Sequence, residues 1–181
     1  MRIRPKSQKS VTYKSEEGSS SPITLALLDA TVNPHLTHSK LKLTDSQDGS
    51  MTVHHFLFHA WPDHGVPETE EDVNALKSLL ETTSKLQQEE QCEVYVNCSA
   101  GIGRTGTFIA LWSLLASPMY FTTPIGKVEP LSGIKPFPAW AKDDKVAKTI
   151  DLLREQRGMM CQTTGQIDFI YRLTGTTPAQ P

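Results

Sequence analysis

The sequence predicts an α/β fold, a β-sheet flanked by helices, in a single domain. Strand-like segments separated by turn-rich pieces fill residues 22–58, and apolar residues recur at helical spacing after residue 70. A glycine-rich turn near residue 100 joins an apolar strand to an apolar helix. The chain has 181 residues, of which 38% are hydrophobic. That is enough for one core and too few to suggest two.

The two ends of the chain are expected to lie outside the folded part. Residues 1–21 carry five basic side chains among serines, with no acidic residue before Glu16. We expect this basic, serine-rich arm to be disordered, as a solvated tail or, alternatively, as a docking segment for an anionic surface. Residues 22–174 form the expected domain, and residues 175–181 form a flexible tail.

The strands are expected first along the chain. Residues 23–28, 41–43 and 53–58 look like strands, and the second and third are separated by the turn-rich piece at residues 45–50. Thr69, followed by three acidic residues, predicts the start of a helix. That helix carries apolar residues at helical spacing: Val73, Leu76, Leu79, Leu80 and Leu86.

Three further helices are expected. Residues 105–117 are apolar almost all round, so this helix should be buried. Residues 118–140 are too rich in proline and glycine for one regular element. Asp143 is then expected to cap a helix, and the last helix covers residues 164–173.

Composition excludes several classes of function. The net charge of −2 with mixed signs argues against general binding of nucleic acid or membrane surfaces. No apolar run approaches the length of a membrane span, and the N-terminus lacks a secretory signal. Three cysteines, Cys92, Cys98 and Cys161, are too few for a disulfide framework. We therefore expect a soluble, cytoplasmic protein.

The segment Val94–Asn97 predicts a short strand that leads into a turn of small residues beginning at Cys98. Successive backbone N–H groups in such a turn point inward, and the following helix adds its positive end, which together make an anion site suited to phosphate. The same field favours a thiolate, so Cys98 is a candidate nucleophile. Arg104 can hold two phosphoryl oxygens, and Thr105 can donate to the sulfur.

No lysine follows the glycines, so the turn is not a nucleotide-binding loop, and we expect no cofactor. Cys98–Gly106 instead resembles the signature of the protein tyrosine phosphatase superfamily, in its tyrosine-specific branch. Trp61–Pro67 resembles that branch's mobile acid loop, and Gln162–Gln166 resembles its glutamine loop. The resemblance covers roughly residues 22–173. It implies a twisted mixed β-sheet flanked by helices, from the C-terminal portion of the catalytic domain.

The resemblance also implies a reaction and a signalling role. Cys98 would form a phosphocysteine while Asp63 protonates the leaving phenolic oxygen and later deprotonates water. Gln162 and Gln166 would position that water, and Trp61 and Pro62 would form part of the hinge of the acid loop. The substrates would be phosphotyrosine-containing proteins or peptides. Substrate-binding residues would be Ser99, Ala100, Gly101, Ile102, Gly103 and Arg104.

Plainer interpretations exist for each candidate. Cys98 can be an inert buried thiol, Asp63 can cap the turn that Pro62 starts, and the two glutamines can be ordinary surface or capping residues. His54, His55, His59 and His64 suggest a metal cluster with Cys98. Alternation along a strand, however, points His54 and His55 to opposite faces, so we expect no metal site.

The sequence departs from the family in three places. Asn97 stands where the family usually has histidine, so we expect a Cys98 pKa higher than is usual for the family. We find no counterpart to the loop whose tyrosine stacks on phosphotyrosine or to the glutamate that braces the arginine. Met159 stands near a common glycine position and would either narrow the cleft or pack harmlessly. A phosphotyrosine-binding pseudophosphatase or an inactive fragment is therefore the alternative, and an inositide phosphatase ranks below both.

Overall fold

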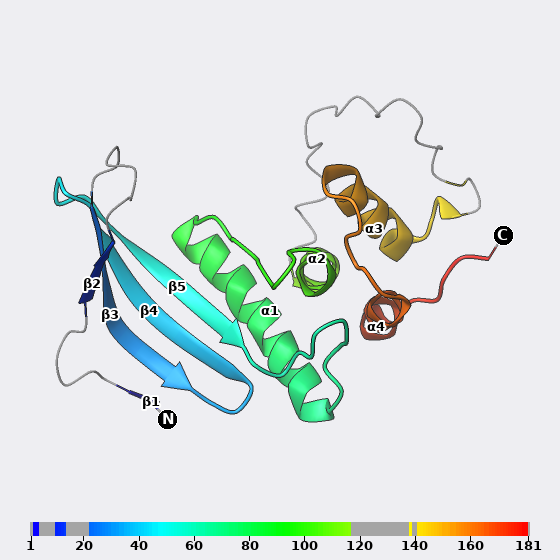
Figure 1. Cartoon of the computed structure of the whole chain (residues 1–181). Helices are drawn as coiled ribbons and strands as arrows, with labels where there is room; N and C mark the ends of the chain where they lie inside the picture. Colours follow the sequence, from blue (N-terminus) through cyan, green and yellow to red (C-terminus); the bar gives the residue numbers. More distant parts are fainter. Residues whose placement is uncertain (1, 4–9, 14–21, 117–137, 139–140, 181) are drawn as a thin grey trace. The chain divides into compact units, whose positions relative to one another are not determined.

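The structure, a computed structural model, describes residues 2–3, 10–13, 22–116, 138 and 141–180. It divides into two compact units, residues 1–60 and 61–181. The first unit is a β-sheet and the second is a group of helices (Figure 1). The α/β class is confirmed, and the single domain expected over residues 22–174 stays a prediction.

The sheet of the first unit has the strand order β1-β3-β4-β5, and β2 also pairs with β3. Every pairing among these strands is antiparallel, so this sheet is not the mixed one that was predicted. The turn between β4 and β5 is held by Asp45, whose Oδ1 accepts from the N–H groups of Gln47 and Gly49, both at 2.8 Å. The strands are β1 (Arg2–Ile3), β2 (Ser10–Tyr13), β3 (Ile23–Val32), β4 (Leu36–Thr44) and β5 (Ser50–Phe58).

Two pieces of the expected disordered arm are strands. Arg2–Ile3 pairs with residues 30–31 of β3, and Ser10–Tyr13 pairs with residues 23–26. The second piece, SVTY, is rich in β-branched and aromatic residues, which suit a pleated strand. The prediction of disorder is therefore wrong for these six residues, and the rest of residues 1–21 lies outside the described part.

The helices of the second unit begin close to where their capping residues predict. Thr69 accepts from the Asp72 N–H at the start of α1, and Thr163 and Gln166 form a capping box at the start of α4. The third helix is capped by Asp144, one residue later than the predicted Asp143. The elements are α1 (Glu70–Glu90), α2 (Gly103–Leu111), the π-helix η1 (Trp112–Ala116), α3 (Lys145–Gln156) and α4 (Thr164–Thr174).

The predicted buried helix at residues 105–117 is α2 continued by η1, and it lies at the centre of this unit. The pair contacts α1, α3 and α4. Leu111 and Ala110 have no exposed surface, and Leu76 of α1, Val146 of α3 and Ile170 of α4 are equally buried. Burial of these apolar side chains is the main stabilising contribution to the unit. The proline- and glycine-rich stretch predicted at residues 118–140 lies, apart from Pro138, outside the described residues.

Asp144 also anchors the C-terminal tail. Its carboxylate accepts from the Ala147 N–H of α3, the Tyr171 hydroxyl of α4 and the Ala179 N–H. Although partial burial raises the pKa of Asp144, these hydrogen bonds together lower it below its ordinary value. The tail that was predicted to be flexible is thus tied to two helices at Ala179.

Val94–Asn97, predicted as a strand, has no strand pairing in the structure. Its side chains alternate between partly buried and exposed, and Tyr95 is 86% exposed. The alternation expected of a strand is present, but a strand also needs a neighbour for its backbone hydrogen bonds. The predicted strand is therefore wrong, although the predicted alternation of its side chains is present.

Gly106 sets the distance between α2 and the segment before α4. A Cβ atom at Gly106 would lie 2.5 Å from the backbone nitrogen of Cys161, which cannot move aside as a flexible side chain does. We expect Gly106→Ala to lower the free energy of unfolding by about 1–3 kcal/mol, because the clash outweighs the helix preference for alanine. Gly158→Ala, where nothing lies within 4 Å, is the matched control and should be near neutral. Urea denaturation measures both, and an unchanged midpoint in Gly106→Ala would contradict this packing.

Candidate active site

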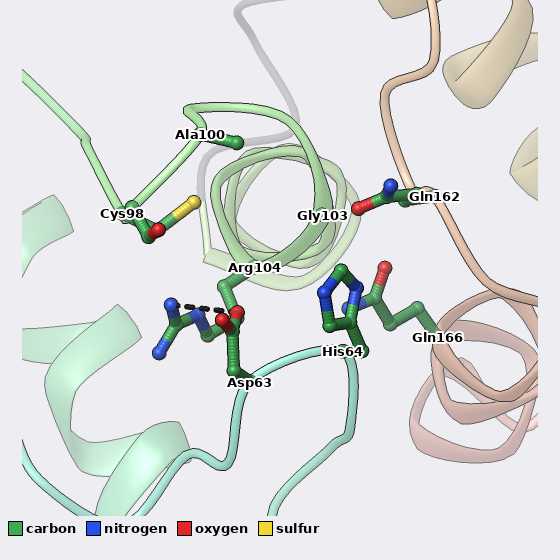
Figure 2. A pocket seen from close by; sticks show the side chains of 9 residues that line it. Asp63, His64, Cys98, Ala100, Gly103, Arg104, Gln162 and Gln166 are labelled. Carbon is green, nitrogen blue, oxygen red and sulfur yellow. Dashed lines mark ion pairs between the residues drawn. The ribbon is translucent and has the colours of Figure 1, made fainter.

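The site is built around the N-terminal end of α2 (Figure 2). The turn that begins at Cys98 passes through Gly101, whose φ of 69° lies in the left-handed region that glycine adopts most easily. Ile102, at the N-cap position of α2, makes no side-chain capping bond. The first N–H groups of the helix therefore face the turn without a capping side chain, which is the arrangement that attracts an anion.

The Cys98 sulfur lies among these donors. Burial raises the pKa of Cys98, but the hydroxyl of Thr105 and the backbone N–H groups of Thr105, Gly101 and Ile102 lower it to about 7. The Thr105 oxygen is buried and has no other hydrogen-bond partner among the described residues, so it is available to the sulfur. At neutral pH a large share of Cys98 is thus the thiolate, which is the nucleophilic form.

Arg104 links this turn to the acid loop, which we define as residues 61–67. Its Nη2 forms an ion pair with Asp63 Oδ1 at 2.9 Å (Figure 2). Its Nη1 donates to the Trp61 carbonyl at 3.3 Å. The Nε of Arg104 is buried and lacks a hydrogen-bond partner within the described part of the chain. An unpaired buried guanidinium donor is costly, and an oxyanion in the turn would satisfy it.

The acid loop has its own internal support. The Trp61 ring is buried and packs edge-on against Phe169 of α4 at 6.4 Å between centroids, and its indole donates to the Gly65 carbonyl at 2.9 Å. Gly65 N–H donates to the Pro62 carbonyl at 3.2 Å. Asp63 stands at the tip of this turn with 61% of its side chain exposed. The loop therefore holds a carboxylate in solvent beside the anion site.

One pocket brings together most of the predicted site residues. Gly103 allows the two glutamines to approach, because a Cβ there would lie 3.1 Å from Gln166 Nε2 and 3.4 Å from Gln162 Oε1. Gly101, Ile102 and Thr105 lie outside the lining and act on the sulfur instead. The predicted residues that line the pocket are Asp63, Cys98, Ser99, Ala100, Gly103, Arg104, Gln162 and Gln166.

Two residues near the site were not assigned a role from the sequence. His64 lines the pocket, and its φ of 58° places it in the left-handed region. Arg157, just after α3, donates to the Ala100 carbonyl at 3.1 Å and so ties down the turn. Nothing in the local pattern around Arg157 indicates a contact with a residue 57 positions away. Met159 is 62% exposed and is not among the residues that line the pocket.

The pKa of Cys98 depends on a hydroxyl that can be removed at nearly constant volume. We expect Thr105→Val to raise the midpoint of Cys98 alkylation by iodoacetate from about 7 toward the ordinary thiol value near 8.5. Alkylation accelerates as pH rises through the pKa, because only the thiolate reacts. Mass spectrometry distinguishes Cys98 from the exposed Cys92 and the buried Cys161. Thr105→Ser keeps the hydroxyl and should keep the midpoint. The same midpoint in the wild type, Thr105→Val and Thr105→Ser would show that the hydroxyl does not lower the pKa of Cys98.

Asn97 offers a second change to the same pKa. The side chain is exposed and neutral, whereas a histidine there carries a positive charge in part of the population at neutral pH. We expect Asn97→His to lower the Cys98 midpoint and Asn97→Gln to leave it unchanged, in the same alkylation series. Identical midpoints for the wild type and Asn97→His would show that the position has no electrostatic influence on the thiol.

Comparison with known proteins shows which family this chain resembles. A family model described as Protein-tyrosine phosphatase matches residues 5–175, a match that begins inside the predicted arm. Tyrosine-protein phosphatase Lar of Drosophila melanogaster is 33% identical over 141 residues, 77% of this chain and 6% of that protein. Tyrosine-protein phosphatase corkscrew of Drosophila virilis is 34% identical over 122 residues, 66% of this chain and 14% of that protein.

Two solved structures share the fold. A protein tyrosine phosphatase of Trypanosoma cruzi has a TM-score of 0.66 at 21% identity, covering 98% of this chain and 55% of that one. Its counterpart from Trypanosoma brucei has a TM-score of 0.60 at 22% identity, covering 90% and 49%. The chain thus spans about half the length of these solved chains and a small part of the relatives named above. The family match over residues 5–175 shows that this chain belongs to the protein-tyrosine phosphatase family.

Proposed function

We propose that this chain hydrolyses phosphotyrosine in proteins or peptides through a phosphocysteine intermediate. One observation carries the proposal: a cysteine with a pKa of about 7 lies among backbone donors in the same pocket as an arginine whose buried Nε has no hydrogen-bond partner among the described residues. A phosphoryl group bound there receives hydrogen bonds from the turn and from Arg104, and its phosphorus faces the Cys98 sulfur.

The proposed reaction has two steps. The Cys98 thiolate attacks phosphorus, the S–P bond forms, and the P–O bond to the phenol breaks as Asp63 gives its proton to the phenolic oxygen. Water then attacks phosphorus, Asp63 takes the water proton, and the S–P bond breaks to release phosphate and the thiolate. Gln162, which lines the pocket, is suited to hold that water. No step needs a cofactor.

A phosphotyrosine-binding role without turnover is the second candidate. The observation that favours it is the 2.9 Å ion pair between Arg104 and Asp63, which engages the acid and the anion-binding arginine with each other. An incoming phosphate must displace this pair before Asp63 can serve as an acid. If displacement leaves Asp63 out of reach of the leaving group, the pocket binds phosphotyrosine and releases it unchanged.

The cellular setting is also a proposal. Cys92, Cys98 and Cys161 are all free thiols, and the proposed nucleophile works only when reduced, so we place the chain in the cytoplasm in a signalling role. Within the described residues, no helix combines the length and the apolar character needed to cross a bilayer.

The proposed function is tested by hydrolysis of para-nitrophenyl phosphate by the purified chain. We expect turnover that vanadate inhibits and that Cys98→Ser abolishes, with circular dichroism confirming that both proteins are folded. Asp63→Asn should lower kcat about a hundredfold with phenyl phosphate, whose leaving group needs a proton. A folded chain that binds a phosphotyrosine peptide without hydrolysing either substrate would replace the enzyme with the binding role.

A further inference from the structure

We infer that Thr163 and Gln166, at the N-terminal end of α4, form a latch that holds the acid loop in place. Thr163 Oγ1 donates to the His64 carbonyl and Gln166 Nε2 donates to the Gly65 carbonyl, both at 3.3 Å. These residues lie about 100 positions apart in the chain. The inference rests on the proposed function and assigns positioning roles at the same site.

The latch is rigid because its two side chains already form the capping box of α4. Thr163 Oγ1 accepts from the Gln166 N–H at 3.2 Å, and Gln166 Oε1 accepts from the Thr163 N–H at 3.3 Å. Each side chain thus accepts a hydrogen bond within the helix cap and donates one to the acid loop. A threonine hydroxyl has a single proton, so the bond to His64 uses all of its donor capacity. Gln166 has no exposed surface, which fixes its rotamer.

The carbonyls that the latch holds belong to the two residues directly after Asp63. On the other side of Asp63, Arg104 Nη1 donates to the Trp61 carbonyl. The acid is therefore held from both directions, while its own side chain stays 61% exposed. Releasing the later contacts would let the loop swing the carboxylate away from the leaving oxygen, and a displacement of about 1 Å can cost a hundredfold in rate.

The role differs from the one that the family resemblance gave to Gln166. Both ends of its amide are already engaged, one by the Thr163 N–H and the other by the Gly65 carbonyl. Gln166 is thus better suited to position the acid loop than to hold the hydrolytic water. That water is left to Gln162, which lines the same pocket (Figure 2).

Substitutions at Thr163 separate the latch from the helix cap. Thr163→Ser keeps both the donor and the acceptor. Thr163→Asp keeps an N-cap acceptor but has no proton to donate at neutral pH, and Thr163→Val loses both functions. If Thr163 only caps the helix, Thr163→Asp should position the acid loop as well as Thr163→Ser does. If Thr163 is part of the latch, Thr163→Asp should release the loop as Thr163→Val does.

The readout is the ratio of kcat for phenyl phosphate to kcat for 2,4-dinitrophenyl phosphate. Dinitrophenolate leaves without a proton, whereas phenolate needs one from Asp63, so the ratio reports how well the acid is positioned. We expect the ratio to fall about tenfold in Thr163→Val and Thr163→Asp and to stay within twofold in Thr163→Ser. In an Asp63→Asn background, Thr163→Val should change the ratio no further, because the acid is already lost. An equal loss with both substrates would overturn the latch.

Hydrogen exchange tests the latch without any activity. We expect amides of residues 61–67 to exchange faster in Thr163→Val and Thr163→Asp than in the wild type and Thr163→Ser, with the α1 amides unchanged. Equal protection in all four proteins would overturn the latch. If the wild-type protein hydrolyses neither substrate but residues 61–67 still lose protection in Thr163→Val and Thr163→Asp, the proposed function fails and the latch stands.

Discussion

The uncapped start of α2 is the constraint on which the rest of the site depends. Backbone N–H groups that no side chain caps must face either water or a negative group, and here they face the sulfur of Cys98. Keeping that geometry requires support from outside the turn. Arg157 holds the Ala100 carbonyl, and Gly106 lets the segment at Cys161 come close behind the helix. The lowered pKa of the thiol thus comes from the Thr105 hydroxyl and from the placement of backbone N–H groups, and from no neighbouring charge that the structure identifies.

Features encoded over a few residues were predictable from the sequence. The helix starts at Thr69 and Thr163 follow from local capping chemistry, and the turn from Cys98 to Arg104 follows from small residues before an apolar helix. The family resemblance, and no local pattern, predicted that residues from the acid loop, the turn and the glutamine loop would share one pocket. The placement of Asp144 as cap, one residue past Asp143, shows the usual uncertainty at an element's boundary.

Contacts between distant segments were not predictable in the same way. The bonds from Thr163 to His64 and from Arg157 to Ala100 join residues 99 and 57 positions apart, and no periodicity encodes them. Val94–Asn97 has the alternation of a strand but no strand pairing, because pairing depends on a second segment that the local sequence does not reveal. Ser10–Tyr13 was missed for the same reason: its neighbours in the sequence are polar, and it forms a strand by pairing with β3.

The ion pair with Asp63 gives the anion-binding Arg104 a counter-ion from the chain itself. An anion that binds Arg104 Nη2 in place of Asp63 must break this pair, and the free energy lost is subtracted equally from the binding of every such anion. An ester with an organic group can offset that loss through contacts beyond the phosphoryl group, whereas inorganic phosphate has no such contacts. The ion pair itself therefore weakens the binding of every such anion alike, and any selectivity between phosphate and its esters must come from contacts with the organic group.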